Sequence, residues 1–454
     1  MKVFAAIVLF AIYLNVPAVA VREFGVPFFA GAAIPLLLAI PLAHSLVVRG
    51  EPLRLPGLLI AGMILLAVHA VSAYFAVRPD ESFDRVLEWA LEGVLLTALI
   101  VNVFRTRADA IAAVVAVVTA GAVMGAIVLL QQALDATDSD FFGFGQLDAE
   151  LVSDQGTLQR RLAGPIGETN RFAQIMAVLI PMAAALAITS RGLQRLGYWF
   201  MTALITGGMA LAFSRGVIVA LVLAVPFALL FNLLKLRHVA FGLLGGLLLM
   251  LMLPHYAERV VSIGDVAIQT LGLSPHGLRN ADGAARGRLT EMKSTALVFA
   301  DHPLLGAGPG MAQVLYADYA PVVGGKVRPG QREAHNLYLQ LAAETGIIGL
   351  AVFATVIVFA FSGLERARKR LAARDYRLWG LACGMELALI IYLGTSLFLH
   401  SAYIRYLWML LGLCVIVASA DRLPLLIHLL GRMLAETVRS VRSREVAGEP
   451  EQGR

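Results

Sequence analysis

Residues 109–131 read DAIAAVVAVVTAGAVMGAIVLLQ, and no charged side chain lies between Asp109 and Asp135. An α-helix needs about 20 apolar residues to cross the hydrocarbon core of a bilayer. The stretch therefore predicts a membrane-spanning helix, and similar stretches recur along the whole chain. In all, the sequence predicts about twelve spans, near 3–20, 27–48, 56–76, 86–104, 109–131, 170–189, 196–213, 216–234, 239–253, 337–362, 378–399 and 403–420.

The composition of the 454-residue chain supports the same fold class. Hydrophobic residues make up 59% and charged residues 15% of the sequence, against about 45–50% and about 25% in soluble domains. These values exclude a disordered chain, a coiled coil and a nucleic-acid-binding domain. We therefore expect an all-α polytopic membrane protein. Cys383 and Cys414 both lie in apolar runs, which indicates buried thiols rather than a disulfide framework.

Basic residues are distributed unequally between alternate connections. One set of short loops, together with the tail, carries 21 lysines and arginines. The short loops on the other side carry only Arg22, Arg78, Arg85, Arg215 and Arg405. Because basic loops stay in the cytoplasm, this asymmetry predicts that both termini are cytoplasmic. We interpret 3–20 as a retained helix, although its end resembles a signal-peptide cleavage site.

Two long segments and a tail complete the predicted organisation. Within a transmembrane domain over 1–421, we expect a first long outer loop, 132–169, and a large outer catalytic loop, 254–336. The apolar positions of LTEMKSTALVFA have helical spacing, so a helix is predicted over 289–300, ending at the turn HPLLGAGPG from His302. The remaining segment, 422–454, is predicted to be a basic, amphipathic cytoplasmic tail.

Arg215 is the first candidate site residue. It lies in AFSRGV, a tight turn between two predicted spans, at the level of the outer headgroups. A guanidinium there can pair with lipid phosphate, or it can bind a specific anionic ligand bidentately. Because arginine in an outer turn opposes the usual charge bias of membrane loops, we favour a functional role.

Arg288 and its neighbour Arg286 lie at the start of the predicted helix 289–300. Cations are unfavourable at a helix N-terminus, whereas a bound phosphate is favourable there. A bound anion would explain the placement of Arg288; the alternative is a solvated loop arginine.

Three further arginines flank GPIGETN at 164–170, before the sixth span: Arg160, Arg161 and Arg171. They can form a loop of mixed charge, or a second side of the same anionic pocket. In the second case Arg161 is the expected diphosphate contact, and Arg160 and Arg171 are further candidates for substrate contacts.

His335 lies in REAHNLYLQ, directly before the tenth span, where the large loop ends. A histidine can take a proton near neutral pH, although a lone histidine is more often structural. Asn336 is a further candidate for a substrate contact. Glu344 lies nine residues from His335, half a turn off in a regular helix. We therefore expect Glu344 to have a packing role unless the helix breaks at Thr345-Gly346, and we keep Glu92 and Glu386 as weaker intramembrane candidates.

No spacing of His, Cys, Asp or Glu residues predicts a metal site, and no cofactor is expected. The glycine-rich segment GAGPG at 306–310 follows no strand and contains no lysine. It therefore predicts a turn rather than a phosphate-binding loop.

The chain resembles the O-antigen ligase family, within the wider O-antigen ligase and polymerase superfamily. The resemblance is carried, in order, by GPIGETN at 164, SRG at 214–216, RLTEMK at 288–293, HPLLGAGPG at 302–310 and AHNLYLQLAAETGIIGL at 334–350. One departure is Met292, where many relatives carry an aromatic residue.

The resemblance implies a fold like that of the polytopic glycosyltransferase type C class, in a bacterial inner membrane, with the active site on the periplasmic face. The implied donor is a polysaccharide on an undecaprenyl-diphosphate-type lipid, and the implied acceptor is a sugar hydroxyl of the lipid A-core. Arg215, Arg288 and Arg161 would stabilise the charge on the leaving diphosphate without a metal, and His335 would take the acceptor proton. We expect a direct, inverting displacement.

Three alternatives stay open. An O-antigen polymerase would use another lipid-linked sugar as acceptor, and a protein O-oligosaccharyltransferase would use a protein hydroxyl. A flippase for lipid-linked oligosaccharides would need no base at all.

Overall fold

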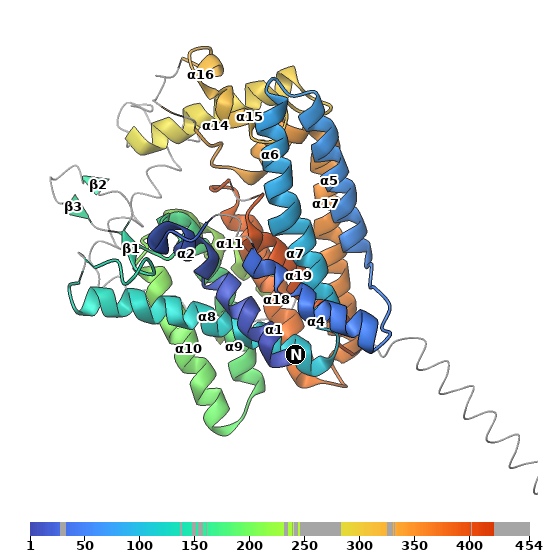
Figure 1. Ribbon diagram of the computed structural model, residues 1–454. Helices are drawn as coiled ribbons and strands as arrows, with labels where there is room; N and C mark the ends of the chain where they lie inside the picture. Colours follow the sequence, from blue (N-terminus) through green and yellow to red (C-terminus); the bar gives the residue numbers. More distant parts are fainter. Residues whose placement is uncertain are drawn as a thin grey trace, which may run out of the picture.

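The computed structural model describes residues 1–27, 33–136, 139–147, 151–152, 158–159, 161–230, 235–237, 239, 244–245, 283–324, 330, 332–400 and 402–421. These residues form an α-helical bundle with a layer of short helices across its upper end (Figure 1). The predicted tail, 422–454, and most of the predicted ninth span, 239–253, lie outside the described residues.

The first half of the chain supplies helices α1 (Lys2–Tyr13), α2 (Val16–Phe24), α4 (Ala39–Ala43), α5 (Gly57–Tyr74), α6 (Pro79–Trp89), α7 (Leu96–Val103) and α8 (Arg107–Ala133), with π-helical turns η1 (His44–Val48) and η2 (Ala90–Leu95). The second half supplies α9 (Thr169–Thr189), α10 (Gly192–Ala210), α11 (Arg215–Leu230), α14 (Gly283–Asp301), α15 (Met311–Val314), α16 (Tyr316–Tyr319), α17 (Leu337–Leu371), α18 (Tyr376–Thr395) and α19 (Arg405–Ser419). Two antiparallel strand pairs lie between α8 and α9: β1 (Gln146–Leu147) with β4 (Leu162–Gly164), and β2 (Leu151–Val152) with β3 (Leu158–Gln159).

Within the described residues, six helices are long and apolar enough to cross a membrane, which supports an all-α membrane protein. They are Gly57–Tyr74, Pro79–Val103, Arg107–Ala133, Thr169–Thr189, Leu337–Leu371 and Tyr376–Thr395. Three shorter apolar helices, Ala33–Val48, Arg215–Leu230 and Arg405–Ser419, accompany them. The predicted number of about twelve spans stays a prediction.

The predicted first span, 3–20, is wrong as a single straight helix. It is divided into α1 and α2, which are bent by 59°. Asn15 adopts a left-handed conformation between them, with φ of 65°, and Pro17 follows in the first turn of α2. Asparagine tolerates that conformation, and the proline lacks the N–H that would continue the hydrogen bonds of α1.

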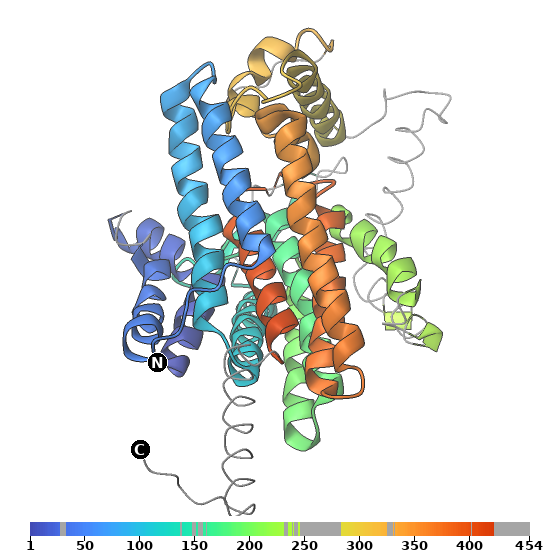
Figure 2. The same cartoon turned by 90° about the vertical axis from the view of Figure 1, so that its right-hand side faces the viewer.

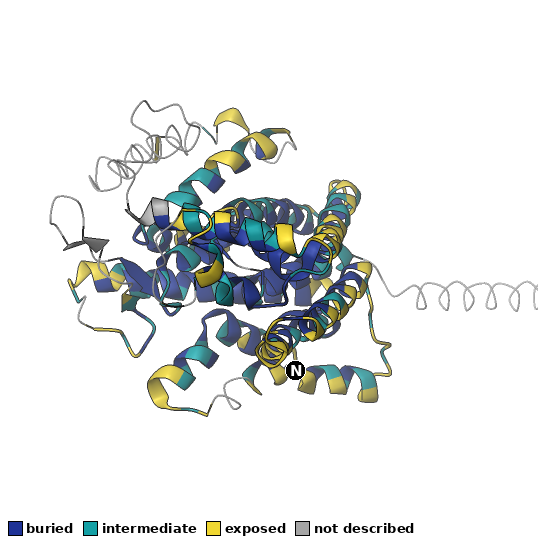
Figure 3. Ribbon diagram, turned by 90° about the horizontal axis from the view of Figure 1, so that it is seen from above, coloured by how far each residue is buried: buried dark blue, intermediate teal, exposed yellow. Residues whose placement is uncertain are grey.

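The core of the bundle is built around α9 and α18. Both helices are mostly buried, and α9 packs on α18, α10 and α8. Its buried face consists largely of alanine and larger apolar side chains, from Phe172 to Ala187. Seen from above, buried residues fill the middle of the bundle and exposed residues form its rim (Figure 3). The helices α5, α6 and α17 stand side by side at one edge of this core (Figures 1 and 2).

The segment that follows α14 forms backbone hydrogen bonds at a break in α17. Gly346 has φ of 66° and ψ of −169°, so the helix is interrupted there. The backbone N–H groups of Ala307 and Gly308 donate to the carbonyl oxygens of Ala343 and Glu344, at 2.8 and 3.1 Å, and Ile347 donates to Pro303 at 2.9 Å. The turn HPLLGAGPG is thus bonded to the backbone of α17 on both sides of the break.

This docking places the layer of α14, α15 and α16 over the end of α17 where the break lies (Figures 1 and 2). Helix α14 packs on α17 and ends at Asp301, directly before the turn. The predicted loop helix is confirmed, but it begins at Gly283, earlier than the predicted start at 289. Arg288 therefore lies in the second turn of α14. The argument that placed it at a helix N-terminus is wrong, because the alanines before it extend the helix.

We predict that Gly346→Ala strongly destabilises the protein. A Cβ at this position would lie 2.0 Å from the carbonyl oxygen of Leu304, and the residue would keep its positive φ. The expected loss is at least about 3 kcal/mol of the free energy of unfolding, measured by denaturant unfolding in detergent micelles. The control is Gly197→Ala in α10, where an added Cβ meets no atom within 4 Å. It should be neutral or stabilising, and equal stabilities of the two variants would contradict the prediction.

Candidate active site

The N-terminus of α9 holds the tight turn that precedes Arg215. The Arg161 guanidinium is only 6% exposed. Its Nε and Nη2 donate to the carbonyl oxygen of Ala212 at 3.1 and 2.8 Å, and Nη2 donates to Asn170 Oδ1 at 3.3 Å. Ser214 Oγ donates to the same Asn170 oxygen at 3.0 Å. These bonds fix the turn between α10 and α11, so Arg215 begins α11 beside the first turn of α9.

Arg171, one residue after Asn170, extends this cluster towards the last loop of the chain. Its Nε lies 3.1 Å from Glu168 Oε2, and its Nη2 lies 2.7 Å from His400 Nε2. The same imidazole nitrogen contacts the Glu333 carboxylate. His400 is 7% exposed, and thus links α9 to the segment that carries His335.

His335 lies next to two groups that the sequence did not single out. Its Nε2 is 3.5 Å from Glu291 Oε2, and Glu291, on α14, is 2% exposed. The His335 and His400 rings meet edge to face, with centroids 5.5 Å apart. Within the described residues, His335 Nδ1 is buried and has no hydrogen-bond partner. One nitrogen therefore faces a carboxylate, and the hydrogen-bonding capacity of the other is unused among the described residues.

Burial and, after it, the nearby charges of Arg288 and His400 lower the pKa of His335 to about 4, although the Glu333 carboxylate acts in the opposite direction. The imidazole is therefore neutral at pH 7 and can accept a proton. Arg288 and Glu291 are three residues apart on α14, so they share one face of that helix. The charge of Arg288 is thus close enough to His335 to affect its protonation.

The structure brings together most, but not all, of the predicted site residues. Arg171, Arg288 and His335 meet around His400 and Glu291, and Arg161 supports the turn that ends in Arg215. Asn336 caps α17, because its Oδ1 accepts from the N–H of Leu339 at 2.9 Å. Arg160 and the side chain of Arg286 lie outside the described part of the chain.

Three residues of the cluster were missed by sequence reasoning: Glu291, Glu333 and His400. Glu291 lies inside the quoted motif RLTEMK, one helical turn from Arg288, and that spacing was the available signal. Glu333 is two residues from His335, but only the fold shows that it contacts His400. Among the described residues, no group of three or more His, Cys, Asp or Glu side chains could hold a metal ion.

The intramembrane acids belong to other contacts. The helix does break at Gly346, yet Glu344 Oε2 accepts a 2.5 Å hydrogen bond from Tyr403, and the carboxylate beside His335 is Glu291. Glu92 pairs with Arg405 at 2.6 Å, and Glu386 Oε2 lies 3.4 Å from Arg368 Nε. The packing role expected for Glu344 agrees with its complete burial.

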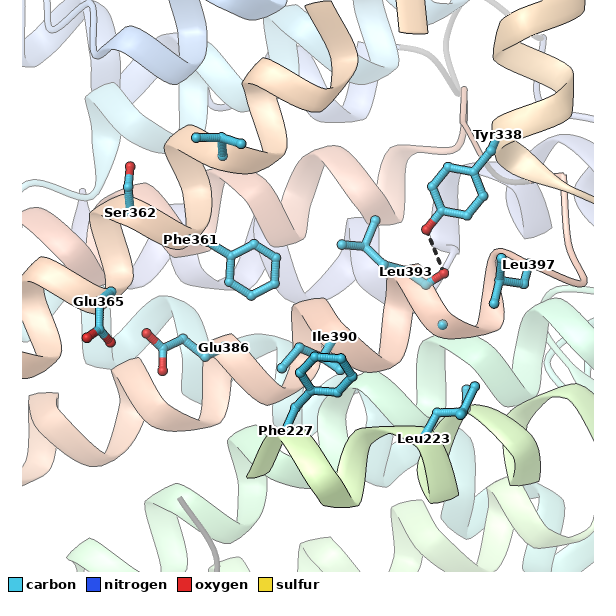
Figure 4. Close-up of a pocket in the computed structure, with 13 residues that line it drawn as sticks. Leu223, Phe227, Tyr338, Phe361, Ser362, Glu365, Glu386, Ile390, Leu393 and Leu397 are labelled. Carbon is cyan, nitrogen blue, oxygen red and sulfur yellow. Dashed lines mark hydrogen bonds between the residues drawn. The ribbon is translucent and has the colours of Figure 1, made fainter. Parts of the chain in front are cut away.

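An apolar pocket of about 750 Å³ begins beside this cluster, between α11, α17 and α18 (Figure 4). Its lining includes Leu223 and Phe227 of α11, Tyr338 and Phe361 of α17, and Leu393 of α18. The pocket adjoins the His335 segment, because Asn336 Nδ2 donates to the Leu397 carbonyl oxygen at 3.1 Å and Leu397 lines the pocket. Glu365 and Glu386 lie at the opposite end from Tyr338 and Leu397 (Figure 4).

Comparison with known families gives one match. Residues 200–354 match the family described as O-antigen ligase. This match covers about a third of the chain and supports its assignment to the O-antigen ligase family. The matched segment of this family contains Arg215, Arg288, Glu291 and His335, while Arg161, Arg171 and His400 lie outside it. A search of curated proteins finds no match.

We predict that His335 makes the stability of the protein depend on pH in acid. In the unfolded chain its pKa is about 6.5, so between pH 6.5 and 4 the unfolded chain binds a proton that the folded protein does not. Stability should therefore fall as the pH falls through this window, and be unaffected by this group above it. Wild type should lose about 3 kcal/mol more than His335→Gln between pH 7 and 4, in unfolding experiments. Parallel pH profiles would contradict the low pKa.

Proposed function

We propose that the chain transfers a polysaccharide from an undecaprenyl-diphosphate-type carrier to a sugar hydroxyl of the lipid A-core, on the periplasmic face of the inner membrane. The family supports a membrane glycosyltransferase of the ligase and polymerase type. The observation that carries the proposal is the neutral His335 imidazole, 3.5 Å from Glu291 and near Arg288, in a segment that adjoins an apolar pocket through Asn336.

His335 is proposed as the base. With its Nε2–H directed at Glu291, the tautomer leaves the Nδ1 lone pair for the acceptor hydroxyl. Glu291 then stabilises the imidazolium that forms, as carboxylates do in other histidine-based catalysts. Such a base contributes about 10²–10⁴-fold to the rate. The low pKa describes the site without its donor; a bound diphosphate adds negative charge, which raises the basicity of His335.

Arg215 and Arg288 are proposed to bind the diphosphate. As the glycosidic bond breaks, its electron pair leaves with the lipid diphosphate, whose charge these guanidinium groups neutralise. Each such donor is worth about 3–4 kcal/mol in the transition state. Arg161 acts on the same group by holding the Arg215 turn through Ala212 and Asn170. This differs from the direct contact that the sequence predicts for Arg161.

The reaction is proposed to be a direct displacement. The acceptor oxygen bonds to the anomeric carbon as the bond from that carbon to the phosphate oxygen breaks, and the hydroxyl proton passes to His335. No covalent sugar–enzyme intermediate forms, so the anomeric configuration should invert. The stereochemistry of the product tests this step, and net retention would exclude it.

The apolar pocket is proposed to take the part of the lipid chain nearest the diphosphate. Its walls are mainly aliphatic and aromatic. At the end near Leu397, Asn336 and Leu337 donate hydrogen bonds to the carbonyl oxygens of Leu397 and Ser396. A lipid seated there would present its headgroup to the loop that holds His335.

We predict that His335→Ala abolishes transfer but retains donor binding. Purified protein in liposomes would receive labelled lipid-diphosphate donor and lipid A-core, and the product would be measured. The variant should lose at least about 100-fold in rate, while His302→Ala, at a histidine that directly follows α14 and lies outside the cluster, should keep wild-type activity. Full activity of His335→Ala would favour a flippase.

The same reconstitution separates the acceptor classes. A ligase joins the label to lipid A-core. Transfer only to a second lipid-linked sugar would instead identify a polymerase, and transfer only to a protein hydroxyl would identify a protein O-oligosaccharyltransferase.

We also predict that Leu223→Trp weakens use of the donor by its lipid chain. The larger ring would fill part of the pocket, so KM for the donor should rise about tenfold, which corresponds to about 1.4 kcal/mol. A donor analogue with a very short chain should show little change. Val222→Trp, on the neighbouring exposed position outside the pocket lining, is the control. Equal effects of the two variants would contradict the assignment of the pocket.

A further inference from the structure

The loop at residues 396–400, between α18 and α19, contacts the start of α17, the start of α11, Arg171 of α9 and the His335 segment. Ser396 accepts from the N–H of Leu337, and Leu397 accepts from Asn336, so the loop holds the start of α17. Phe398 packs on α11 directly after Arg215, since a Cβ added at Gly216 would lie 3.2 Å from the Phe398 Cβ. His400 follows, between α9 and the His335 segment.

The His335 segment has little support from its own backbone. Within the described part of the chain, residues 332–335 form no backbone–backbone hydrogen bond. His335 itself has φ of 46°, a left-handed conformation that costs a β-carbon-bearing residue about 1–3 kcal/mol. Side-chain contacts must therefore hold this conformation in place.

His400 supplies those contacts on the side that faces α9. Its Nε2 contacts the Glu333 carboxylate and lies 2.7 Å from Arg171 Nη2. Its ring packs edge to face against the His335 ring. The imidazole is buried, and Arg171 is tied to Glu168 in turn. His400 thus joins the arginine-bearing end of α9 to the two residues on either side of Ala334.

We propose that His400, acting through Glu333 and Arg171, is a positioning residue that holds the strained His335 segment in its reactive placement. The inference rests on the proposed transferase function. His400 does not touch the reacting atoms; it fixes where the His335 nitrogen lies relative to the diphosphate-binding arginines. A displacement of about 1 Å at such a base can cost about 10²-fold in rate.

The test compares two substitutions of different shape. His400→Gln keeps a polar terminal group that can reach Glu333 and Arg171, whereas His400→Phe keeps the ring but has no hydrogen-bonding nitrogen. We expect His400→Phe to lower kcat by about 10–100-fold with donor affinity within about twofold of wild type, and His400→Gln to recover most of the lost rate. His302→Ala serves as the control for loss of an imidazole outside the cluster.

A second measurement addresses the contact with Glu333. Glu333→Gln should lower kcat to a similar extent, and adding His400→Phe to it should cause little further loss, because the two act as one unit. Donor affinity, measured with lipid diphosphate in liposomes, shows that each variant is folded.

The outcomes separate this inference from the function on which it rests. If wild type transfers no sugar to any acceptor, the proposed function fails. If wild type is active and His400→Phe is equally active, or His400→Gln is as impaired as His400→Phe, the positioning role is overturned. Additive losses for Glu333→Gln and His400→Phe would overturn it as well.

Discussion

The backbone hydrogen bonds between the turn HPLLGAGPG and the break in α17 determine how the layer of α14, α15 and α16 is placed on the bundle. Ala307 and Gly308 donate to carbonyl oxygens before the break, and Ile347 donates back to Pro303 after it. Backbone groups freed by a broken helix are costly unless they are satisfied, and this segment satisfies them. Because α14 ends at Asp301 and α17 begins two residues after His335, the same bonds set the distance between Glu291 and His335.

Charge is organised around this junction in pairs. Glu291 faces His335, Glu333 faces His400, and Glu168 faces Arg171. Each carboxylate compensates part of the cost of burying the cationic or titratable group beside it. Burial and the charge of Arg288 together keep His335 neutral. A site with this balance is suited to a strongly anionic ligand, because such a ligand restores the proton affinity that burial and arginine remove.

The uniform apolar runs allowed the long helices to be predicted within a few residues. The runs at 109–131 and 170–189 correspond to α8 and α9. Every face of these helices contacts protein or lipid, so the sequence is apolar throughout and its hydropathy alone marks the helix. Broken helices were less predictable. Asn15 and Pro17 mark the end of α1, but the continuous hydropathy of 3–20 outweighed them in the prediction. Gly346 breaks α17 only because the chain from Pro303 to Gly308 pairs with the backbone there.

The candidate site was predictable where one short motif carried it. Arg215, in its tight turn, and His335, at the loop boundary, could be singled out locally, whereas His400 and Glu291 gain their roles from contacts with residues 65 and 44 positions away. Arg161 shows the opposite case. Its charge suggested a ligand, but its burial and its bonds to Ala212 make it a brace for the next arginine.

In the proposed function, the two carboxylates at the far end of the apolar pocket, Glu365 and Glu386, would limit how much of a lipid chain the pocket holds. Eight residues of α18 separate Gly394, near the headgroup end, from Glu386, or about 12 Å at 1.5 Å per residue. Hydrocarbon beyond that depth would meet charge, so it must turn aside into the surrounding bilayer. In the proposed function, the protein would therefore contact only the beginning of its carrier, and its activity would not depend on the total length of the lipid.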